Sequence, residues 1–177
     1  MTYPVFASGD VLNASDMNGV GLWLVKTQAV GTGVGSVTVT GAFSADYDNY
    51  RITYTGGITS GAVIQMTLGA AATQYYSQLI YATYAGTTVL ANVPDNNAAR
   101  WSFVGFGNAN FATVRMDLCS PFQTTRSTMT ANYISDVNSG TVQGLLNDAT
   151  SYTSFTLTAA SGGTLTGGTI RVYGYRN

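Results

Sequence analysis

The segments Asn49–Thr55, NYRITYT, and Val63–Leu68, VIQMTL, decide the fold class, because both alternate apolar and polar side chains. A period of two residues places every second side chain on the same face of a β-strand, whereas a helix needs a period of 3.6. The apolar side chains that share one face of each segment are Tyr50, Ile52 and Tyr54, and Ile64, Met66 and Leu68. Both segments therefore predict half-buried strands.

The same kind of pattern continues along the chain in both directions. We expect further strands at Leu22–Val30, Ser36–Thr40, Tyr75–Tyr84, Thr87–Val93, Arg100–Phe106, Phe111–Cys119, Arg126–Ser135, Thr141–Leu146, Ser154–Ala159 and Thr169–Arg176. Pro94 should end one strand, with a turn at Asp95–Asn97, and another turn is expected at Asn138–Gly140. Gly107–Asn110 should join two strands as a hairpin. The first and last strands should lie close together, as the ends of a compact domain often do.

About a dozen short strands separated by turn residues are typical of a β-sandwich or barrel. Composition agrees, because the chain has one Lys and no Glu, two residue types that favour helices. Thr, Ser, Gly, Tyr and Val, which suit strands and turns, take their place. We therefore predict an all-β fold: a jelly-roll-like antiparallel β-sandwich, formed as a single domain by residues 21–177 and preceded by a short N-terminal helical hook.

The predicted hook lies in residues 1–20. Asn13 can cap a helix, Asp16 stands where a carboxylate favours the positive helix end, and Leu12 and Met17 have the spacing of a hydrophobic staple. A helix this short is not stable alone in water, so its apolar side chains must be buried on a surface of the chain's own domain or of a neighbouring subunit. We favour the second alternative, an anchoring role. The anchoring residues are then Phe6, Val11, Leu12, Asn13, Asp16 and Met17.

Charged residues make up only 8% of the chain, against about 25% in ordinary soluble proteins. The formal net charge of −1 excludes a polybasic nucleic-acid or membrane footprint and leaves little repulsion between copies. We therefore expect much of the surface to be covered by symmetry-related copies, although uncharged polar surface also suits carbohydrate contact. No apolar run reaches 18 residues and no signal peptide is recognisable, so we expect synthesis in a cytoplasm without membrane insertion.

Few side chains can support catalysis. The absence of His excludes Ser-His-Asp and Cys-His arrangements and zinc sites built on His. Cys119 is the single cysteine, so it forms no disulfide within the chain, and we expect it to be buried. A pair of aspartates could act on a glycoside, and Asp46 and Asp48 form a local pair. They can also be turn residues, which we favour, or calcium ligands. We expect no enzymatic activity, no metal and no cofactor.

Aromatic side chains are more numerous than charged ones, with twelve Tyr, seven Phe and two Trp. Tyrosine suits sugar stacking and protein interfaces as well as packing on a sheet. Trp23 and Trp101 lie within strand patterns and are expected in the core. If the protein binds a ligand, the contacts should come from turns that the fold needs least. Those residues are Asp95, Asn96, Asn97, Asn108, Asn110 and Asn138.

The N-terminal motif Phe6-x-x-Gly9-x-Val11-Leu12-x-Ala14-x-Asp16-Met17-Asn18 resembles the first segment of many small tailed-bacteriophage virion proteins of the minor tail or fibre type. In those proteins the segment tends to read F-x-x-G-x-V-L-T-A-A-D-M-N. The resemblance continues in Leu22–Gly31, Phe43–Ile52 and Gly167–Asn177. It implies a β-sandwich displayed on a phage particle, commonly trimeric and sometimes binding host surface glycans. It does not imply catalysis.

These expectations describe a bacteriophage virion structural protein, a non-enzymatic short fibre or minor tail protein that contributes to host-surface attachment. It is expected to be made in the host cytoplasm, to form a homotrimer and to contact other virion subunits through residues 1–20. A host surface glycan is a further expected partner, and nucleic acid is not. The alternative within this class is a head decoration protein or head fibre on the capsid. The alternative outside it is a glycan-processing enzyme.

Overall fold

A computed structural model describes residues 8–9, 21–59 and 62–175, and this part of the chain consists of strands, turns and loops without a helix. The all-β prediction is thus confirmed. The strands are β1 (Leu22–Ala29), β2 (Thr32–Val34), β3 (Ser36–Val39), β4 (Asn49–Ile58), β5 (Val63–Leu68), β6 (Tyr75–Thr83), β7 (Leu90–Ala98), β8 (Trp101–Phe106), β9 (Ala112–Cys119), β10 (Ser127–Ile134), β11 (Asn138–Leu146), β12 (Phe155–Ala159) and β13 (Leu165–Tyr175). The six predicted anchoring residues, and with them the helical hook, lie outside the described residues.

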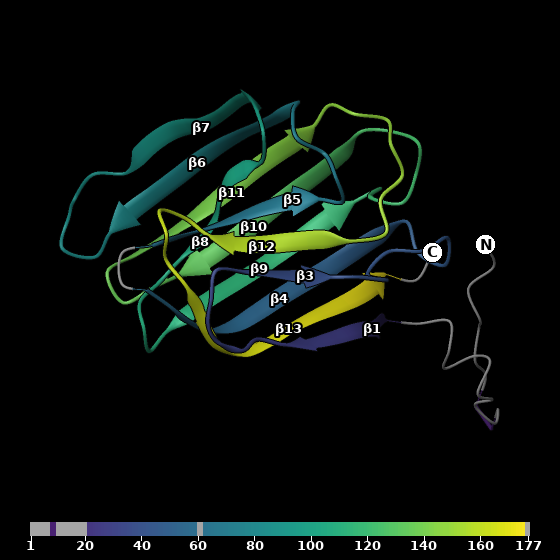
Figure 1. The fold of residues 1–177 in the computed structure, drawn as a ribbon, viewed down its shortest axis with the longest axis horizontal. Coiled ribbons are helices and arrows are strands. Elements are labelled where there is room, and N and C mark those ends of the chain that lie inside the picture. Colours follow the sequence, from purple (N-terminus) through teal and green to yellow (C-terminus); the bar gives the residue numbers. More distant parts are fainter. Residues whose placement is uncertain (1–7, 10–20, 60–61, 176–177) are drawn as a thin grey trace.

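The strands form two antiparallel sheets that pack as a β-sandwich (Figure 1). The larger sheet has the order β1-β13-β4-β9-β10-β11-β6-β7, with β2 also paired to β13. The smaller sheet has the order β3-β12-β5-β8. β1 pairs with β13, which confirms that the first and last predicted strands lie together. The β6–β7 hairpin reaches beyond the smaller sheet, at the upper left of Figure 1.

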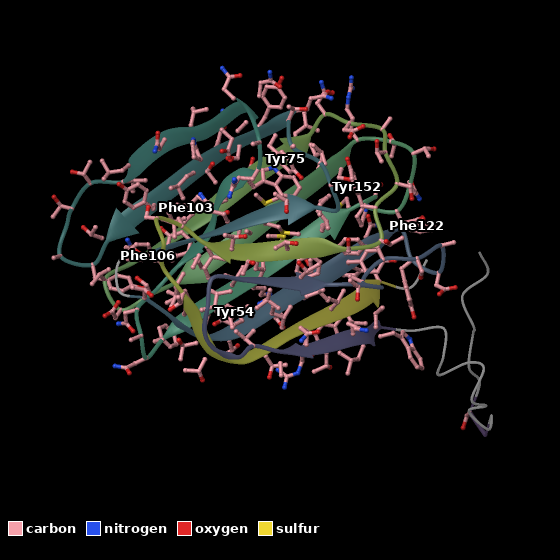
Figure 2. All side chains as sticks on the ribbon, in the orientation of Figure 1. Tyr54, Tyr75, Phe103, Phe106, Phe122 and Tyr152 are labelled. Carbon is pink, nitrogen blue, oxygen red and sulfur yellow. The ribbon has the colours of Figure 1, made fainter. Side chains whose placement is uncertain are left out.

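The core lies between the two sheets and is built by the alternation seen in the sequence. Tyr50, Ile52 and Tyr54 of β4 are at most 1% exposed, and Met129, Ala131 and Tyr133 of β10 at most 3%. Aromatic side chains occur at both ends of the sandwich: Phe103 and Phe106 lie at one end and Tyr152 and Phe122 at the other (Figure 2). The predicted inward faces are therefore confirmed where the pattern was clear.

Two turn predictions, at Asp95–Asn97 and Asn138–Gly140, are wrong because strand pairing overrides local turn chemistry. Pro94 and Asp95–Asn97 belong to β7, an edge strand where a missing backbone N–H is tolerated. Asn138–Gly140 begins β11 and pairs with both β10 and β6. Gly107–Asn110 is a turn, closed by a 3.0 Å hydrogen bond from Asn108 N to the Phe111 carbonyl. Its two sides meet in one antiparallel bridge between Gly107 and Ala112, as in a hairpin, but the strands it joins, β8 and β9, belong to different sheets.

Two burial predictions are also wrong. Trp23 is 38% exposed, because it lies near the start of β1, an edge strand with a neighbour on one side only. Cys119 is exposed because it ends β9 on the face opposite to buried Leu118. Trp101, by contrast, is fully buried as predicted, with its ring edge-on to Tyr75 at 5.1 Å between centroids.

Candidate functional site

The outer face of the larger sheet, which points away from the smaller sheet, is a broad polar surface. Its side chains alternate along each strand with the buried ones, as Thr53 does between Ile52 and Tyr54 on β4. The strand register arranges them in rows across the sheet. One row is Arg171, Thr53, Arg115, Asn132, Thr141, Ile80 and Ala91; the next is Tyr173, Arg51, Asp117, Thr130, Gln143 and Gln78. These rows are rich in hydroxyl, amide and guanidinium groups and contain one carboxylate.

A hollow of about 380 Å³ lies between β11, β6 and β7, and we call it the amide hollow. Its polar lining consists mainly of three exposed amide side chains, Gln78, Asn96 and Gln143, beside the half-buried ring of Tyr76. The other lining residues are Ser77, Val93, Asp95, Gly144 and Leu145. Among the described residues, none of the three amide groups has a side-chain hydrogen bond. They are therefore available to donate and accept hydrogen bonds from a ligand beside an aromatic ring.

Asp95 is a buried member of this hollow and is only 1% exposed. Its Oδ2 accepts hydrogen bonds from Ser77 Oγ at 2.5 Å and from Ser102 N at 2.9 Å. Its Oδ1 has no partner within the described part of the chain. Because Ser77 belongs to β6 and Ser102 to β8, Asp95 holds β7 against one strand of each sheet. The carboxylate therefore positions the strand that carries Asn96.

A charged cluster lies further along the outer face, on β13, β4 and β9. Arg51 donates from Nε and Nη2 to the two carboxylate oxygens of Asp117, both at 2.8 Å. Tyr175 donates its hydroxyl to Asp117 Oδ1 at 2.5 Å, and its ring centroid lies 5.4 Å from the Arg51 guanidinium carbon. Burial alone would raise the pKa of Asp117, but the hydrogen bonds from Arg51 and Tyr175 and the charges of Arg51 and Arg115 lower it below its ordinary value.

The six residues predicted for ligand contact do not come together. Asp95 and Asn96 line the amide hollow, so two of them lie at the candidate site, although as part of a strand. Asn97 lies three residues beyond Pro94 near the end of the same strand, and its Oδ1 accepts a hydrogen bond from Gln74 N at 3.2 Å. Asn97 therefore ties β7 to the segment before β6.

The other three predicted contact residues lie in turns or at a strand end away from this hollow. Asn108 Oδ1 accepts from the backbone N–H groups of Asn110 and Phe111, both at 2.9 Å. Asn138 Oδ1 accepts from Ser135 Oγ at 2.8 Å. None of the three lines the amide hollow. The side-chain oxygens of Asn108 and Asn138 are used to hold the chain's own turns.

Each aspartate of the described part has a local hydrogen-bond partner. Asp46 accepts from Ser44 Oγ at 2.9 Å in the loop before β4, and Asp48 accepts from Gln123. The other pairs are Asp95 with Ser77, Asp117 with Arg51, Asp136 with Asn108, and Asp148 with Tyr152. No group of three or more His, Cys, Asp or Glu side chains that could hold a metal occurs within residues 21–59 and 62–175. The carboxylates are thus engaged singly, in different parts of the fold.

Sequence reasoning missed Tyr76, Gln78 and Gln143 as possible contact residues. The sequence did indicate that these three side chains face outward, because each is the outward residue of an alternating strand. The alternation says which face a residue occupies, but it does not say that β6 and β11 are neighbours, and they are separated by about 60 positions in the chain. The amide hollow therefore depends on a pairing between distant segments that no local pattern encodes.

Comparison of the sequence with models of known protein families found no match, and comparison with curated proteins found none either. A helix long and apolar enough to cross a membrane does not occur among the residues described.

Proposed function

We propose that this chain is a non-enzymatic structural protein of a bacteriophage virion, a short fibre or minor tail protein that contributes to host-surface attachment. The observation that carries the attachment role is the amide hollow on the broad, weakly charged outer face. Saccharides present many hydroxyl groups together with apolar C–H faces, which suit free amide groups and a tyrosine ring. The ligand is a host surface glycan, bound without bond cleavage.

A jelly-roll core supports the idea of a displayed domain. The orders β1-β13-β4-β9 and β3-β12-β5-β8 are those of two four-stranded sheets in an eight-stranded jelly roll. The hairpins β6–β7 and β10–β11 are then insertions that widen one sheet, and both contribute to the amide hollow. The hook of residues 1–20, which directly precedes the sandwich, is the proposed anchor to other virion subunits after synthesis in the host cytoplasm.

Self-association as a homotrimer is part of the proposal. The support is a set of exposed apolar side chains on and between the strands of the two inserted hairpins, which we call the tip patch. Its members are Ile80, Tyr84, Val89, Leu90, Val93, Ile134 and Val137. Apolar groups gathered on a surface in this way mark interaction sites. The same patch favours a second candidate, a head decoration protein or head fibre that buries this surface on the capsid.

Localisation in purified particles tests the virion role. Labelled antibody or subtomogram averaging should place the chain at the tail or fibre, whereas a position on the capsid lattice selects the decoration role. The paired substitution Leu12→Asp and Met17→Asp should abolish incorporation into particles. The sandwich of that variant should unfold at the same temperature as the wild type. Absence of the wild-type chain from particles would contradict the proposal.

Glycan binding by the isolated protein tests the attachment role. The double variant Gln78→Ala/Gln143→Ala should lose about tenfold or more in affinity, because each lost hydrogen bond contributes about 1 kcal/mol. Gln28→Ala, on β1, is the matched control and should bind like the wild type. Equal losses of affinity in both variants would show that the amide hollow is not the binding site. A glycan array on which the protein binds no glycan would contradict the attachment role. Release of reducing ends from host polysaccharide would instead indicate an enzyme.

A further inference from the structure

A second hollow on the outer face, of about 330 Å³, lies over β4, β9 and β10. Its lining combines one guanidinium, three hydroxyls and one amide on the outward positions. Those residues are Arg115, Thr53, Thr55, Thr113 and Asn132, and the lining is completed by Ile134 and by Tyr54 and Val114 of the same strands. We call it the arginine hollow. Its outward members come from adjacent strands in register, so the rigid sheet fixes their relative positions.

Arginines are concentrated around this hollow. Arg171 on β13 pairs in register with Thr53, which pairs with Arg115 on β9, so the two arginines lie two strands apart, roughly 10 Å between backbones. Arg51 lies two residues before Thr53, on the same face of β4. Three of the six arginines of the chain therefore share one region of the outer face.

Only one of these three guanidinium groups is neutralised by an ion pair. Arg51 binds Asp117, whereas Arg115 and Arg171 form no ion pair or hydrogen bond with the other described residues. Counting three arginines and one aspartate, this region carries a net charge of about +2, in a chain whose formal net charge is −1. Asp136, beyond the end of β10, is engaged by Asn108. The surface is thus locally cationic although the molecule is not.

The hydroxyl groups of the hollow are also available. Thr113 Oγ1 donates to the Ile134 carbonyl at 3.1 Å, which leaves its oxygen lone pairs free to accept. Thr53 and Thr55 have no side-chain hydrogen bond among the residues described. An oxyanion seated beside Arg115 could therefore accept a charge-assisted hydrogen bond from the guanidinium and neutral ones from Thr53 and Asn132.

We propose that the arginine hollow binds the carboxylate or sulfate groups of an acidic polysaccharide. Arg115 and Arg171 contact successive charged groups, and the threonine and asparagine side chains contact the hydroxyls between them. This inference rests on the proposed attachment function for the kind of polymer, and it adds a subsite distinct from the amide hollow. Nucleic acid is disfavoured as the ligand, because a local charge of about +2 is far below the extended basic surface that phosphate backbones require.

The test measures binding of dextran sulfate and of polygalacturonate to the isolated full chain at low ionic strength. Neutral dextran, inorganic sulfate and single-stranded DNA of matched length are the comparison ligands. The acidic polysaccharides should bind, and their affinity should fall as salt rises. Arg115→Gln should lose about tenfold in affinity, and Arg115→Gln/Arg171→Gln more, with a shallower salt dependence.

Arg126→Gln is the matched control, because it removes the same charge from an exposed arginine in the loop before β10. It should bind within about twofold of the wild type. Equal losses of affinity for Arg126→Gln and Arg115→Gln would show that the arginine hollow is not the binding site. Binding of inorganic sulfate without binding of either acidic polysaccharide would also contradict the proposal. DNA binding as tight as that of the polysaccharides would overturn the ligand class. Because purified protein is used, these outcomes do not depend on whether the chain is found in particles.

Discussion

At the residue scale, Asp117 is the side chain on which the charged cluster depends. It lies on β9 and accepts hydrogen bonds from Arg51 on β4 and Tyr175 on β13, so it connects three neighbouring strands. Desolvation by burial and the hydrogen bond to Asp117 together raise the pKa of Tyr175 to about 12. The hydroxyl of Tyr175 is therefore a neutral donor throughout the physiological pH range.

The lowered pKa of Asp117 predicts that its contribution to stability depends on pH. Since its folded-state pKa lies below the unfolded value of about 3.9, the contribution is complete above pH 4 and is lost as pH falls through the folded-state pKa. Asp117→Asn should lower the free energy of unfolding at pH 7 by about 1 kcal/mol, a small value because 39% of the side chain is exposed. Urea unfolding should show this difference at pH 7, and the difference should shrink as the pH falls below the unfolded-state pKa of about 3.9.

A double-mutant cycle is the control for this prediction. Arg51→Gln should lose a similar amount at pH 7, and Asp117→Asn should cost little more when added to Arg51→Gln. Additive losses would mean that the two side chains stabilise the protein independently. A pH-independent difference for Asp117→Asn would contradict the assignment of the lowered pKa to the folded state.

Replacement of two buried tyrosines by phenylalanine should change the stability of the protein in different ways, because only one of the two hydroxyl groups has a hydrogen-bond partner among the described residues. Tyr75 Oη accepts the backbone N–H of Leu68 at 2.8 Å, so Tyr75→Phe leaves that donor unpaired and should cost about 1–3 kcal/mol. Tyr133 Oη is buried without a partner among the described residues, so Tyr133→Phe should be neutral or stabilising. Thermal unfolding of both variants gives the comparison. A larger loss for Tyr133→Phe would show that its hydroxyl is hydrogen-bonded in solution.

At the element scale, β13 is the strand where backbone conformation matters most. Thr166 pairs with Gly57 and Thr169 with Thr55, so Gly167 and Gly168 form a bulge opposite a single residue of β4. Both glycines have positive φ, 62° and 81°. A Cβ on Gly168 would overlap the backbone carbonyl of Thr55. The bulge lets β13 pair with β1 and β2 on one side and β4 on the other.

Gly168→Ala should therefore destabilise the protein by about 2–4 kcal/mol, combining a positive φ with a collision against backbone. Gly162→Ala is the matched control, because Gly162 has a similar φ of 74° but open space where the Cβ would lie. That variant should lose only about 1 kcal/mol. Chemical unfolding of the two variants separates the collision from the φ cost, and equal losses would show that β13 relaxes around the added methyl group.

The elements also mark how far the sequence could predict this fold. Alternation gave the inward faces of β4, β5, β10 and β13, because burial on one face needs nothing more than a period of two. It could not give strand partners, and so it missed that Gly140 lies between Tyr133 and Tyr81 inside a sheet. The prediction that Pro94 ends a strand was wrong for the same reason, because a proline is tolerated within β7 only when β7 is an edge strand. Of the candidate site, Asp95 and Asn96 were predicted, while the residues that β6 and β11 bring beside them were not.

At the scale of the whole molecule, both edges of the larger sheet are protected against strand addition. β1 carries Lys26, the only lysine of the chain, next to a register shift between Leu24 and Lys26. β7 carries Pro94 and two register shifts in its pairing with β6. Lysine, proline and bulges on edge strands prevent unpaired backbone groups from pairing with another chain. Association of copies through the edges of the larger sheet is therefore disfavoured.

The tip patch is the surface that we propose for contact with a second copy of this chain. Its seven members are uncharged, and with a formal net charge of −1 the electrostatic repulsion between copies is weak. Ile80, Val89 and Ile134 line one shared hollow of about 390 Å³, so apolar side chains of a neighbouring copy have a recess to enter. Burial of such side chains contributes about 25 cal/mol for each Å² removed from water.

Ile80→Ser/Ile134→Ser should therefore convert the proposed trimer to monomer, as measured by light scattering after size-exclusion chromatography. The two side chains are 48% and 55% exposed, so the fold should lose little stability. Leu22→Ser/Leu24→Ser is the matched control at the opposite edge, where the exposures are 40% and 56%, and it should leave the mass unchanged. A wild-type chain that is monomeric would show that the isolated protein does not self-associate, and loss of the oligomer only in the control would place the interface on β1. Either result would contradict self-association through the tip patch.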